Sequence, residues 1–161
     1  MPYLLDANIF IEANKKYYSF KLCPGFWDWL IQSNGNGLVL SHVSVLKELL
    51  AFGDELSKWA KKQGPGFFMP MDASTSASMK KVSAWIAKHF QAAAVTKFLA
   101  GADPFLIACA MAHGYTVVSE EVFFQHSAKK VKIPEVCAHF HVPCINTFKM
   151  LSDEGATFLL K

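Results

Sequence analysis

Acidic residues recur where the sequence changes from a strand pattern to a helix pattern. Asp6 ends the first apolar run, and Asp103 opens a helix rich in small residues that leads into a strand over residues 115–119. Glu120 and Glu121 follow that strand directly. Carboxylates at strand ends and helix starts can converge on one crevice of an α/β sheet. Several such oxygens together make a site for a hard divalent cation, which is the chemistry that this pattern suggests.

Each acid also has a plain structural interpretation. Asp6 can cap the helix that follows it, and Asp103, which a proline follows, matches an ordinary helix start. Taken alone, Asp103 is better explained as a helix cap than as a ligand. Glu48 can be an exposed residue beside an apolar helix stripe, and Glu120 and Glu121 can be surface acids. The joint arrangement of these residues therefore carries the functional hypothesis.

The elements that must position these acids alternate between strands and helices. We expect strands at residues 2–6, 38–41, 115–119 and 143–146. We expect helices at residues 7–18, from Pro24, at 43–53, 54–63, 72–90 and 92–99, from Asp103 and from Pro134, with a turn at 34–37 and a weakly specified segment at 147–161. Alternation of this kind indicates an α/β fold with three α/β/α layers, a short, mainly parallel central sheet and a helical insert at about 54–98.

The composition indicates a single domain, residues 1–161, with a sizeable core. Apolar residues make up 52% of the chain, yet no run approaches the roughly 18 apolar residues of a membrane helix. The first residues lack the basic region of a secretory signal. The four cysteines are therefore expected to be reduced and the protein to be cytoplasmic, without a membrane partner.

The basic residues are unusual because all 16 are lysines. Without arginine, bidentate contacts to a phosphate or a guanine edge cannot form, so phosphate contacts must come from lysines, helix N-termini or a metal ion. Lys129, Lys130 and Lys132 are the best candidates for substrate contact, because they lie in the loop after Glu121. His126 in the same loop could act on a leaving group, although an exposed loop histidine is usually passive.

The ordered set of motifs resembles the PIN-domain family of metal-dependent ribonucleases. The matching segments are Leu4-Leu5-Asp6-Ala7-Asn8-Ile9-Phe10, residues 41–48, 102–108 and 117–124, and the closing segment 133–145. Each motif is weak alone, but the resemblance in this order spans nearly the whole chain. Within this family the chain looks most like the small bacterial toxins of toxin–antitoxin pairs, or a branch of the PIN-like superfamily whose activity is untested.

The resemblance implies a PIN-like fold and a specific set of site residues. Asp6, Glu48 and Asp103 match the three principal acids of the family. The fourth acid usually stands two residues after a Ser or Thr, which gives Glu121 counted from Ser119; Glu120 remains a competitor, because the family more often has Asp there. The resemblance further implies that Asn8 orients the first aspartate and that Ser119 braces the fourth acid. Two departures are the absence of arginine and the long insert.

The activity implied is that of an endoribonuclease that uses one or two Mg²⁺ or Mn²⁺ ions, held by Asp6, Glu48, Asp103 and Glu121, to promote in-line attack of water on RNA. Its partners would be RNA, a cognate antitoxin and a second copy of the chain. An alternative is a catalytically inactive PIN-like domain that binds RNA or protein. A phosphotransfer enzyme with Asp6 as nucleophile is disfavoured, because Asn8 stands where a second Asp is needed.

Other motifs have structural interpretations. Cys137, His139, His141 and Cys144 resemble a zinc cluster, but their spacing misses the usual patterns, and a helix that packs Cys137 and Phe140 inward is favoured. The four tryptophans fall in predicted helices, where core or interface packing is the default and base stacking the minority role.

Overall fold

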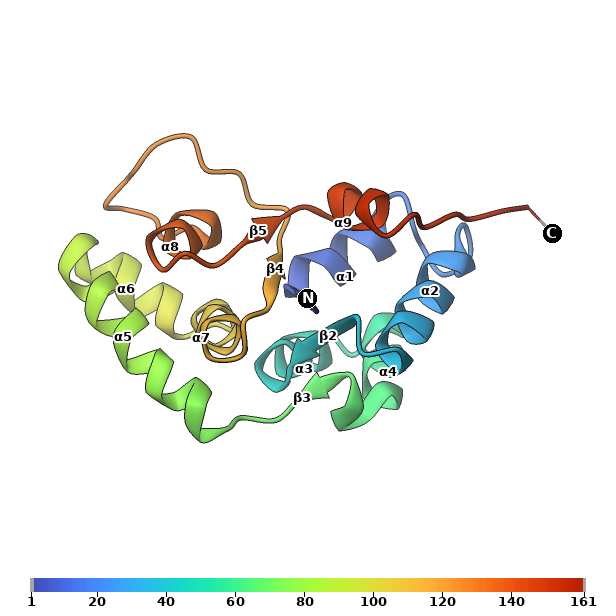
Figure 1. The fold of residues 1–161 in the computed structure, drawn as a ribbon, viewed down its shortest axis with the longest axis horizontal. Helices are drawn as coiled ribbons and strands as arrows, with labels where there is room; N and C mark the ends of the chain where they lie inside the picture. Colours follow the sequence, from blue (N-terminus) through green and yellow to red (C-terminus); the bar gives the residue numbers. More distant parts are fainter. Residues whose placement is uncertain (1, 161) are drawn as a thin grey trace.

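The computed structural model describes residues 2–160 and has an α/β fold built around a parallel sheet (Figure 1). Within this range the sheet contains five strands in the order β3-β2-β1-β4-β5, and all neighbouring strands run parallel. The strands are β1 (Tyr3–Leu5), β2 (Val39–His42), β3 (Phe68–Met69), β4 (Thr116–Val118) and β5 (Cys144–Ile145). The predicted three-layer fold with a short parallel sheet is confirmed.

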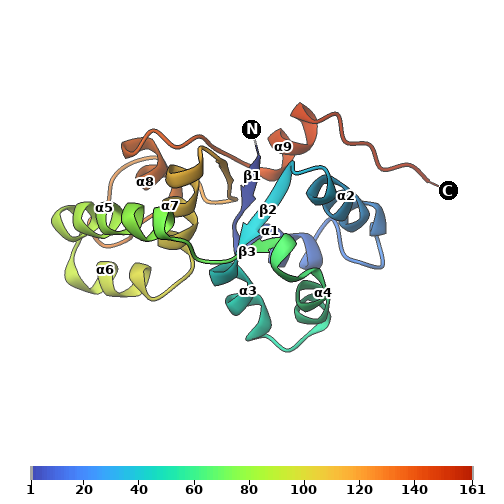
Figure 2. The same ribbon diagram turned by 60° about the horizontal axis from the view of Figure 1, so that its bottom comes forward.

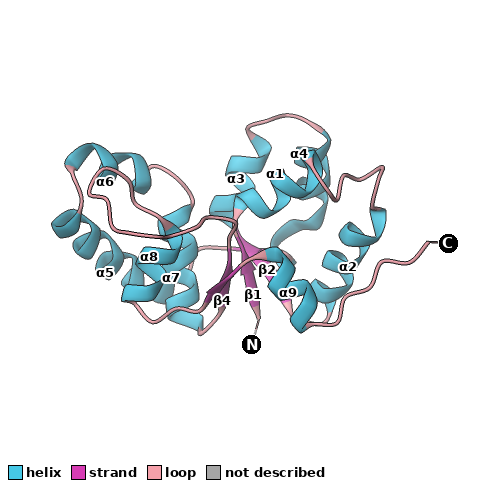
Figure 3. Cartoon of the chain, turned by 90° about the horizontal axis from the view of Figure 1, so that it is seen from above, coloured by secondary structure: helices cyan, strands magenta, loops and turns pink. Residues whose placement is uncertain are grey.

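Helices cover both faces of this sheet. They are α1 (Ala7–Lys15), α2 (Pro24–Gly35), α3 (Val43–Leu50), α4 (Glu55–Gln63), α5 (Ala73–His89), α6 (Ala92–Leu99), α7 (Asp103–His113), α8 (Ile133–His139) and α9 (Thr147–Asp153), with a 3₁₀ turn η1 at Gly64–Gly66. Figure 3 shows α5, α6, α7 and α8 on one side of the strands and α2, α4 and α9 on the other. Figure 2 shows α3 and α4 below the strands, past the end of β2.

β1 is the central strand of the sheet. It pairs with β2 on one side and with β4 on the other. Leu4 and Leu5 have no exposed surface. Apolar residues pointing to both faces are expected for a parallel strand that helices cover on both sides. β1 therefore carries Asp6, the next residue, to the middle of the carboxyl edge of the sheet.

An aromatic cluster fills the core between the sheet and α4. The ring of Phe10 lies 5.8 Å from that of Trp59 and 6.0 Å from that of Phe67. Trp27 is buried and stacks on Phe20 at 4.1 Å. Trp29, Trp59 and Trp85 are partly buried against the same core, so the predicted packing role of the tryptophans is confirmed.

The predicted helical insert contains a strand that the sequence pattern does not indicate. β3 follows η1 and pairs with β2, so that Ser41 lies opposite Phe68. Two residues are too few to give a recognisable alternation of apolar and polar positions. The edge strand is therefore defined by its partner β2 rather than by its own sequence.

The turn predicted at residues 34–37 begins later than expected, because α2 continues to Gly35. Asn34 lies inside the helix, and its side-chain amide donates to the carbonyl of Val39 at 2.8 Å and to that of Gly66 at 3.0 Å. Gly37 then turns the chain with a φ of +73°, a conformation that favours glycine. Asn34 thus belongs to the contact between α2, β2 and η1.

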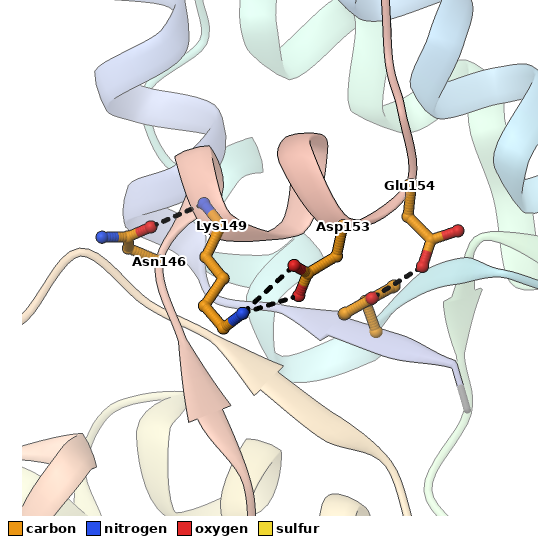
Figure 4. A network of polar contacts seen from close by, with 5 residues as sticks. Asn146, Lys149, Asp153 and Glu154 are labelled. Carbon is orange, nitrogen blue, oxygen red and sulfur yellow. Dashed lines mark hydrogen bonds and ion pairs between the residues drawn. The ribbon is translucent and has the colours of Figure 1, made fainter.

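The segment after β5, which the sequence specifies weakly, forms α9. The Asn146 side chain accepts a hydrogen bond from the amide of Lys149 at 2.8 Å and so caps the helix. Lys149 Nζ pairs with the Asp153 carboxylate at 3.0 Å, and the Tyr3 hydroxyl donates to Glu154 at 2.7 Å (Figure 4). The Tyr3 hydrogen bond attaches the end of α9 to the central strand, and the other two contacts stabilise the helix itself.

Two further findings concern helix length and the thiols. Within residues 2–160, no single helix is long and apolar enough to cross a membrane. In the same range, α6 and α7 reach such a length and composition only when they are joined across a bend of 71°. All four cysteines are free thiols, and Cys109 and Cys137 are buried.

Candidate functional site

The strand order creates a crevice beside β1. From β1 the chain proceeds to β2 and β3 on one side, and it later returns to β4 and β5 on the other. In open α/β sheets, ligands bind outside the carboxyl ends of the strands where the direction of winding reverses. Asp6 follows β1 and Ser119 follows β4 at that position, and the amide of Asp6 donates to the carbonyl of Val118 at 3.0 Å.

Asp6 is buried, with 1% of its surface exposed. Its Oδ2 accepts a hydrogen bond from the Ser119 hydroxyl at 3.2 Å. Burial and, second, the charge of Glu121 raise the pKa of Asp6 to about 7, against opposing effects of Ser119 and of the amides of Asn8 and Ala7. Asp6 holds the N-cap position of α1, and the backbone amides of Asn8 and Ala7 act on its carboxylate, but no side-chain capping hydrogen bond is formed within residues 2–160.

Asp103 reaches the same edge from another element. α7 precedes β4 and runs back along the sheet, so its first residue lies at the carboxyl ends of the strands. The pKa of Asp103 is raised to about 8. Burial is the largest cause, and the charges of Asp6, Glu121 and Glu48 add to it. The structure corrects the interpretation of Asp103 as a helix cap: Ala102 occupies the cap position, and no side-chain cap is formed within residues 2–160.

Glu48 supplies the group that interacts with the start of α7. Its Oε1 accepts a hydrogen bond from the amide of Ala102 at 2.8 Å. Gly101 permits this approach, because a Cβ atom at that position would lie 3.3 Å from the same oxygen. Glu48 is half-buried, so it is not the exposed flank residue of the plain interpretation.

Glu121 and Glu120 have different surroundings although they are adjacent. The Glu121 amide donates to the Ser119 hydroxyl at 3.2 Å, and its Oε2 accepts from the amide of Ile133 at 2.8 Å. Glu120 Oε1 accepts from the amide of Thr147 at 3.0 Å and from the Thr147 hydroxyl, so it holds the start of α9. The charge of Glu121, but not that of Glu120, acts on both Asp6 and Asp103, which favours Glu121 as the fourth acid.

Ser119 connects two of these acids. It donates to the carboxylate of Asp6 and accepts from the amide of Glu121, so it fixes the ends of β1 and β4 relative to each other. The predicted contact of Ser119 with the fourth acid is thus present through the backbone of Glu121. No side-chain hydrogen bond of Asn8 is found within residues 2–160, and its predicted role in orienting Asp6 stays a prediction.

The donor set of the site is made of carboxylate oxygens, the ligands that Mg²⁺ and Mn²⁺ prefer. The raised pKa values of Asp6 and Asp103 reflect burial and mutual repulsion, which a bound cation would relieve. Among residues 2–160, however, no three His, Cys, Asp or Glu side chains lie close enough to hold an ion as they are arranged. Glu48 and Glu121 each bind a backbone amide through one carboxylate oxygen, and the acidic side chains must move closer together to close around a cation. The residues fit a hard divalent ion by charge and donor type.

A cavity of about 420 Å³ opens next to the acidic residues. Asn8 and Glu121 line it on the side of the site, and Tyr17 and Phe148 line it farther out. Neither Tyr17 nor Phe148 stands out in the sequence as a site residue. The sequence shows only that Tyr17 and Tyr18 are adjacent and directly follow a helix. It does not show that α9 brings Phe148 to the same place.

The loop between β4 and α8 carries the predicted substrate-binding lysines. Lys129 and Lys130 are exposed, whereas Lys132 Nζ donates to the carbonyl of Val122 at 3.1 Å and so ties the loop to itself. His126 pairs with Glu135 at 2.5 Å. This contact gives His126 a structural partner outside the acidic site. Lys129 and Lys130 remain candidates for phosphate contact, and Lys132 has a structural partner.

The zinc-like segment is used for packing. Cys137 is fully buried on α8, and Phe140 packs against the core, as the favoured interpretation predicts. His139 stacks on Trp85 with a ring distance of 4.3 Å. Interaction with the neighbouring Cys144 thiol, together with burial, raises the pKa of Cys137 above its usual range.

Comparison with known proteins gives a family but no function. The family model described as a domain of unknown function (DUF4411) matches residues 3–158, so the chain belongs to this family. Searches of curated proteins and of solved structures found no match.

Proposed function

We propose that this DUF4411 protein is a metal-dependent endoribonuclease that cleaves RNA by in-line attack of water. The observation that supports the proposal most is that Asp6, Glu48 and Glu121, which come from three separate segments, lie near enough to Asp103 for their charges to raise its pKa. The ordered motifs around these acids, which resemble those of PIN-domain ribonucleases, add further support.

All four acids hold the metal in this proposal. Asp6 and Asp103 would hold Mg²⁺ or Mn²⁺ together with Glu48 and Glu121, as one or two ions. When bound, such an ion acidifies water and neutralises charge on a phosphodiester. Ser119 keeps the Asp6 carboxylate in place. The N-termini of α1 and α7 lie at the same edge and add partial positive charge, which favours a phosphate there.

The test is cleavage of a labelled RNA pool in Mn²⁺ with and without EDTA. The parent protein should cut the RNA, EDTA should stop it, and Asp6→Asn and Glu121→Gln should be inactive while Glu120→Gln keeps its activity. The reverse result for the two glutamates would make Glu120 the fourth acid. Absence of cleavage by a folded protein that binds Mn²⁺ would contradict the proposal.

A second candidate function is binding of RNA or protein without cleavage. It is favoured by the backbone hydrogen bonds of Glu48 and Glu121, which occupy two of the four acids. Under this alternative the RNA pool would be bound but stay intact in Mn²⁺, and EDTA would leave the affinity unchanged.

The resemblance to toxins adds a proposed binding partner and a proposed cellular compartment. An antitoxin or a second copy of the chain could cover exposed apolar side chains such as Leu22, Leu159 and Leu160. The reduced thiols suit the cytoplasm. Co-expression with the neighbouring open reading frame should yield a co-purifying complex and suppress cleavage; a product that neither binds nor inhibits would contradict the toxin assignment.

A further inference from the structure

The cavity beside Glu121 has the size and position of a substrate subsite. Its volume of about 420 Å³ falls within the range of small-ligand pockets. The residues that matter here are Asn8, Lys16, Tyr17, Glu121, Thr147 and Phe148. Because Glu121 belongs to both the cavity and the acidic site, a strand whose phosphate lies at the acids would place a neighbouring nucleotide in the cavity.

Two aromatic rings at the cavity are unusually exposed. Tyr17 and Phe148 have 69% and 56% of their surface exposed, and their ring centroids are 6.5 Å apart with the planes tilted by 59°. The two rings therefore do not stack on each other. Tyr18, in contrast, stacks on Phe26 at 4.6 Å and forms a fixed wall. Exposed rings beside a phosphate-binding site are what stacking with nucleobases requires.

The segment that carries Phe148 is held firmly. Asn146 caps α9, Lys149 pairs with Asp153 on the next turn, and Glu154 is bound by the Tyr3 hydroxyl (Figure 4). Glu120 binds the amide of Thr147, the residue before Phe148. Phe148 is thus exposed on a well-anchored helix, which lowers the entropy cost of using it as a stacking surface.

The polar groups of the cavity suit a base rather than a second phosphate. Lys16 is already paired with Glu12 at 2.6 Å, and Glu120 and Glu121 add negative charge. Asn8 is exposed, and within residues 2–160 its side-chain amide has no hydrogen-bond partner, so this group can donate to or accept from a base edge. Because the chain contains no arginine, aromatic rings and amides must take over the stacking and hydrogen bonding.

We propose that this cavity binds one nucleobase of single-stranded RNA, stacked on Tyr17 and Phe148, next to the phosphodiester at the acidic site. This inference rests on the proposed function for its substrate. It adds that recognition of the strand depends on a base at one fixed position from the cut.

The test walks a single abasic position along a fluorescein-labelled hexaribonucleotide. Dissociation constants are measured by anisotropy in Ca²⁺ for the parent, for Tyr17→Leu/Phe148→Leu and for the control Phe52→Leu, which alters an exposed ring away from the cavity. At one position, loss of the base should weaken binding about ten-fold in the parent and in the control. The double variant should bind the intact RNA about ten-fold more weakly and show no further loss at that position.

The remaining outcomes separate the subsite from the enzyme activity. An abasic penalty that is the same in the double variant, or no position with a penalty, overturns the subsite even if Mn²⁺-dependent cleavage is present. The expected pattern without any cleavage in Mn²⁺ supports the subsite and removes the nuclease proposal. If the double variant unfolds, Tyr17→Leu and Phe148→Leu are measured singly, and each should reduce the penalty.

Discussion

The two ends of α7 place an aspartate in opposite surroundings. At the His113 end, Asp72 accepts a hydrogen bond from the amide of Thr75 at 2.7 Å and pairs with His113 at 2.7 Å. The Thr75 hydrogen bond, assisted by His113, lowers the pKa of Asp72 to about 2. At the other end, burial and neighbouring acids raise the pKa of Asp103 to about 8.

The comparison shows what separates a helix cap from a candidate ligand. Both aspartates stand at the start of a helix, so their sequence contexts look alike. Asp72 is surrounded by donors that favour its charge, whereas Asp103 is surrounded by carboxylates that oppose it. An acid that is packed among other acids destabilises the folded state, and a cation in the site would offset this destabilisation.

The largest expected effect separates Asp103→Asn from Asp72→Asn. Asn keeps the cap at residue 72, and at residue 103 it replaces a repelled carboxylate by a neutral group of the same size, so both variants should fold. We expect Asp103→Asn to lower Mn²⁺-dependent RNA cleavage at least about 100-fold, since even groups that only support metal ligands are worth 10–100-fold. Asp72→Asn should retain cleavage. Comparable activity in both variants, measured under single-turnover conditions, would contradict the assignment of Asp103.

Metal binding should stabilise only a protein with the intact acidic site. At a Mn²⁺ concentration about 100 times its Kd, the parent should gain about 3 kcal/mol. For a domain of this size that corresponds to a rise in Tm of roughly 5–10 °C, measurable by calorimetry. Asp72→Asn should show the same rise and Asp103→Asn little or none. An equal rise in all three proteins would place the ion elsewhere.

The pH dependence of stability should have opposite signs at the two ends. Because the folded-state pKa of Asp6 and Asp103 is raised, their protonated forms stabilise the fold below about pH 4, and this contribution is lost as the pH rises through 7–8. The lowered pKa of Asp72 stabilises the fold above about pH 4, and this contribution is lost as the pH falls toward 2. In EDTA, the Tm of the parent should fall by a few degrees more than that of Asp103→Asn between pH 5.5 and 8.5. If the Tm of the parent and that of Asp103→Asn fall equally over this pH range, the charge of Asp103 is not a source of the repulsion among the acids.

The smallest expected effect concerns the exposed lysines of the loop after β4. Lys129→Ala/Lys130→Ala should weaken RNA binding and flatten its salt dependence by about 0.7 in logarithmic slope for each phosphate that no longer pairs with a lysine. The matched control is Lys61→Ala/Lys62→Ala at the exposed end of α4. Binding measured from 50 to 200 mM salt should change only in the first variant; equal slopes in both would remove these lysines from the site.

Much of the fold can be predicted from the sequence, because the parallel strands are continuous apolar runs separated by helices of ordinary length. β3 is the exception, since its two residues become a strand only by pairing with β2. The segment after β5 is specified by the Asn146 cap and by Tyr3, and the latter is 151 positions away from Glu154. Contacts of that range leave no local pattern in the sequence.

The sequence nominates the acids of the candidate site, but it does not show their hydrogen-bond partners. The order of Asp6, Glu48, Asp103 and Glu121 along the chain indicates convergence. The sequence does not show that Glu48 binds the amide of Ala102 or that Glu120 binds Thr147, because both hydrogen bonds depend on how helices approach the sheet edge. These backbone partners distinguish two adjacent glutamates that look equivalent in the sequence.

The central position of β1 has a consequence during synthesis on the ribosome. β1 must wait for β4, which is made more than 100 residues later, before its second neighbour exists. At about 5–20 residues per second, that delay is on the order of ten seconds. Asp6 meets Ser119 and Glu121 only after this interval, so a nascent chain carries an incomplete acidic site while it is still next to ribosomal RNA.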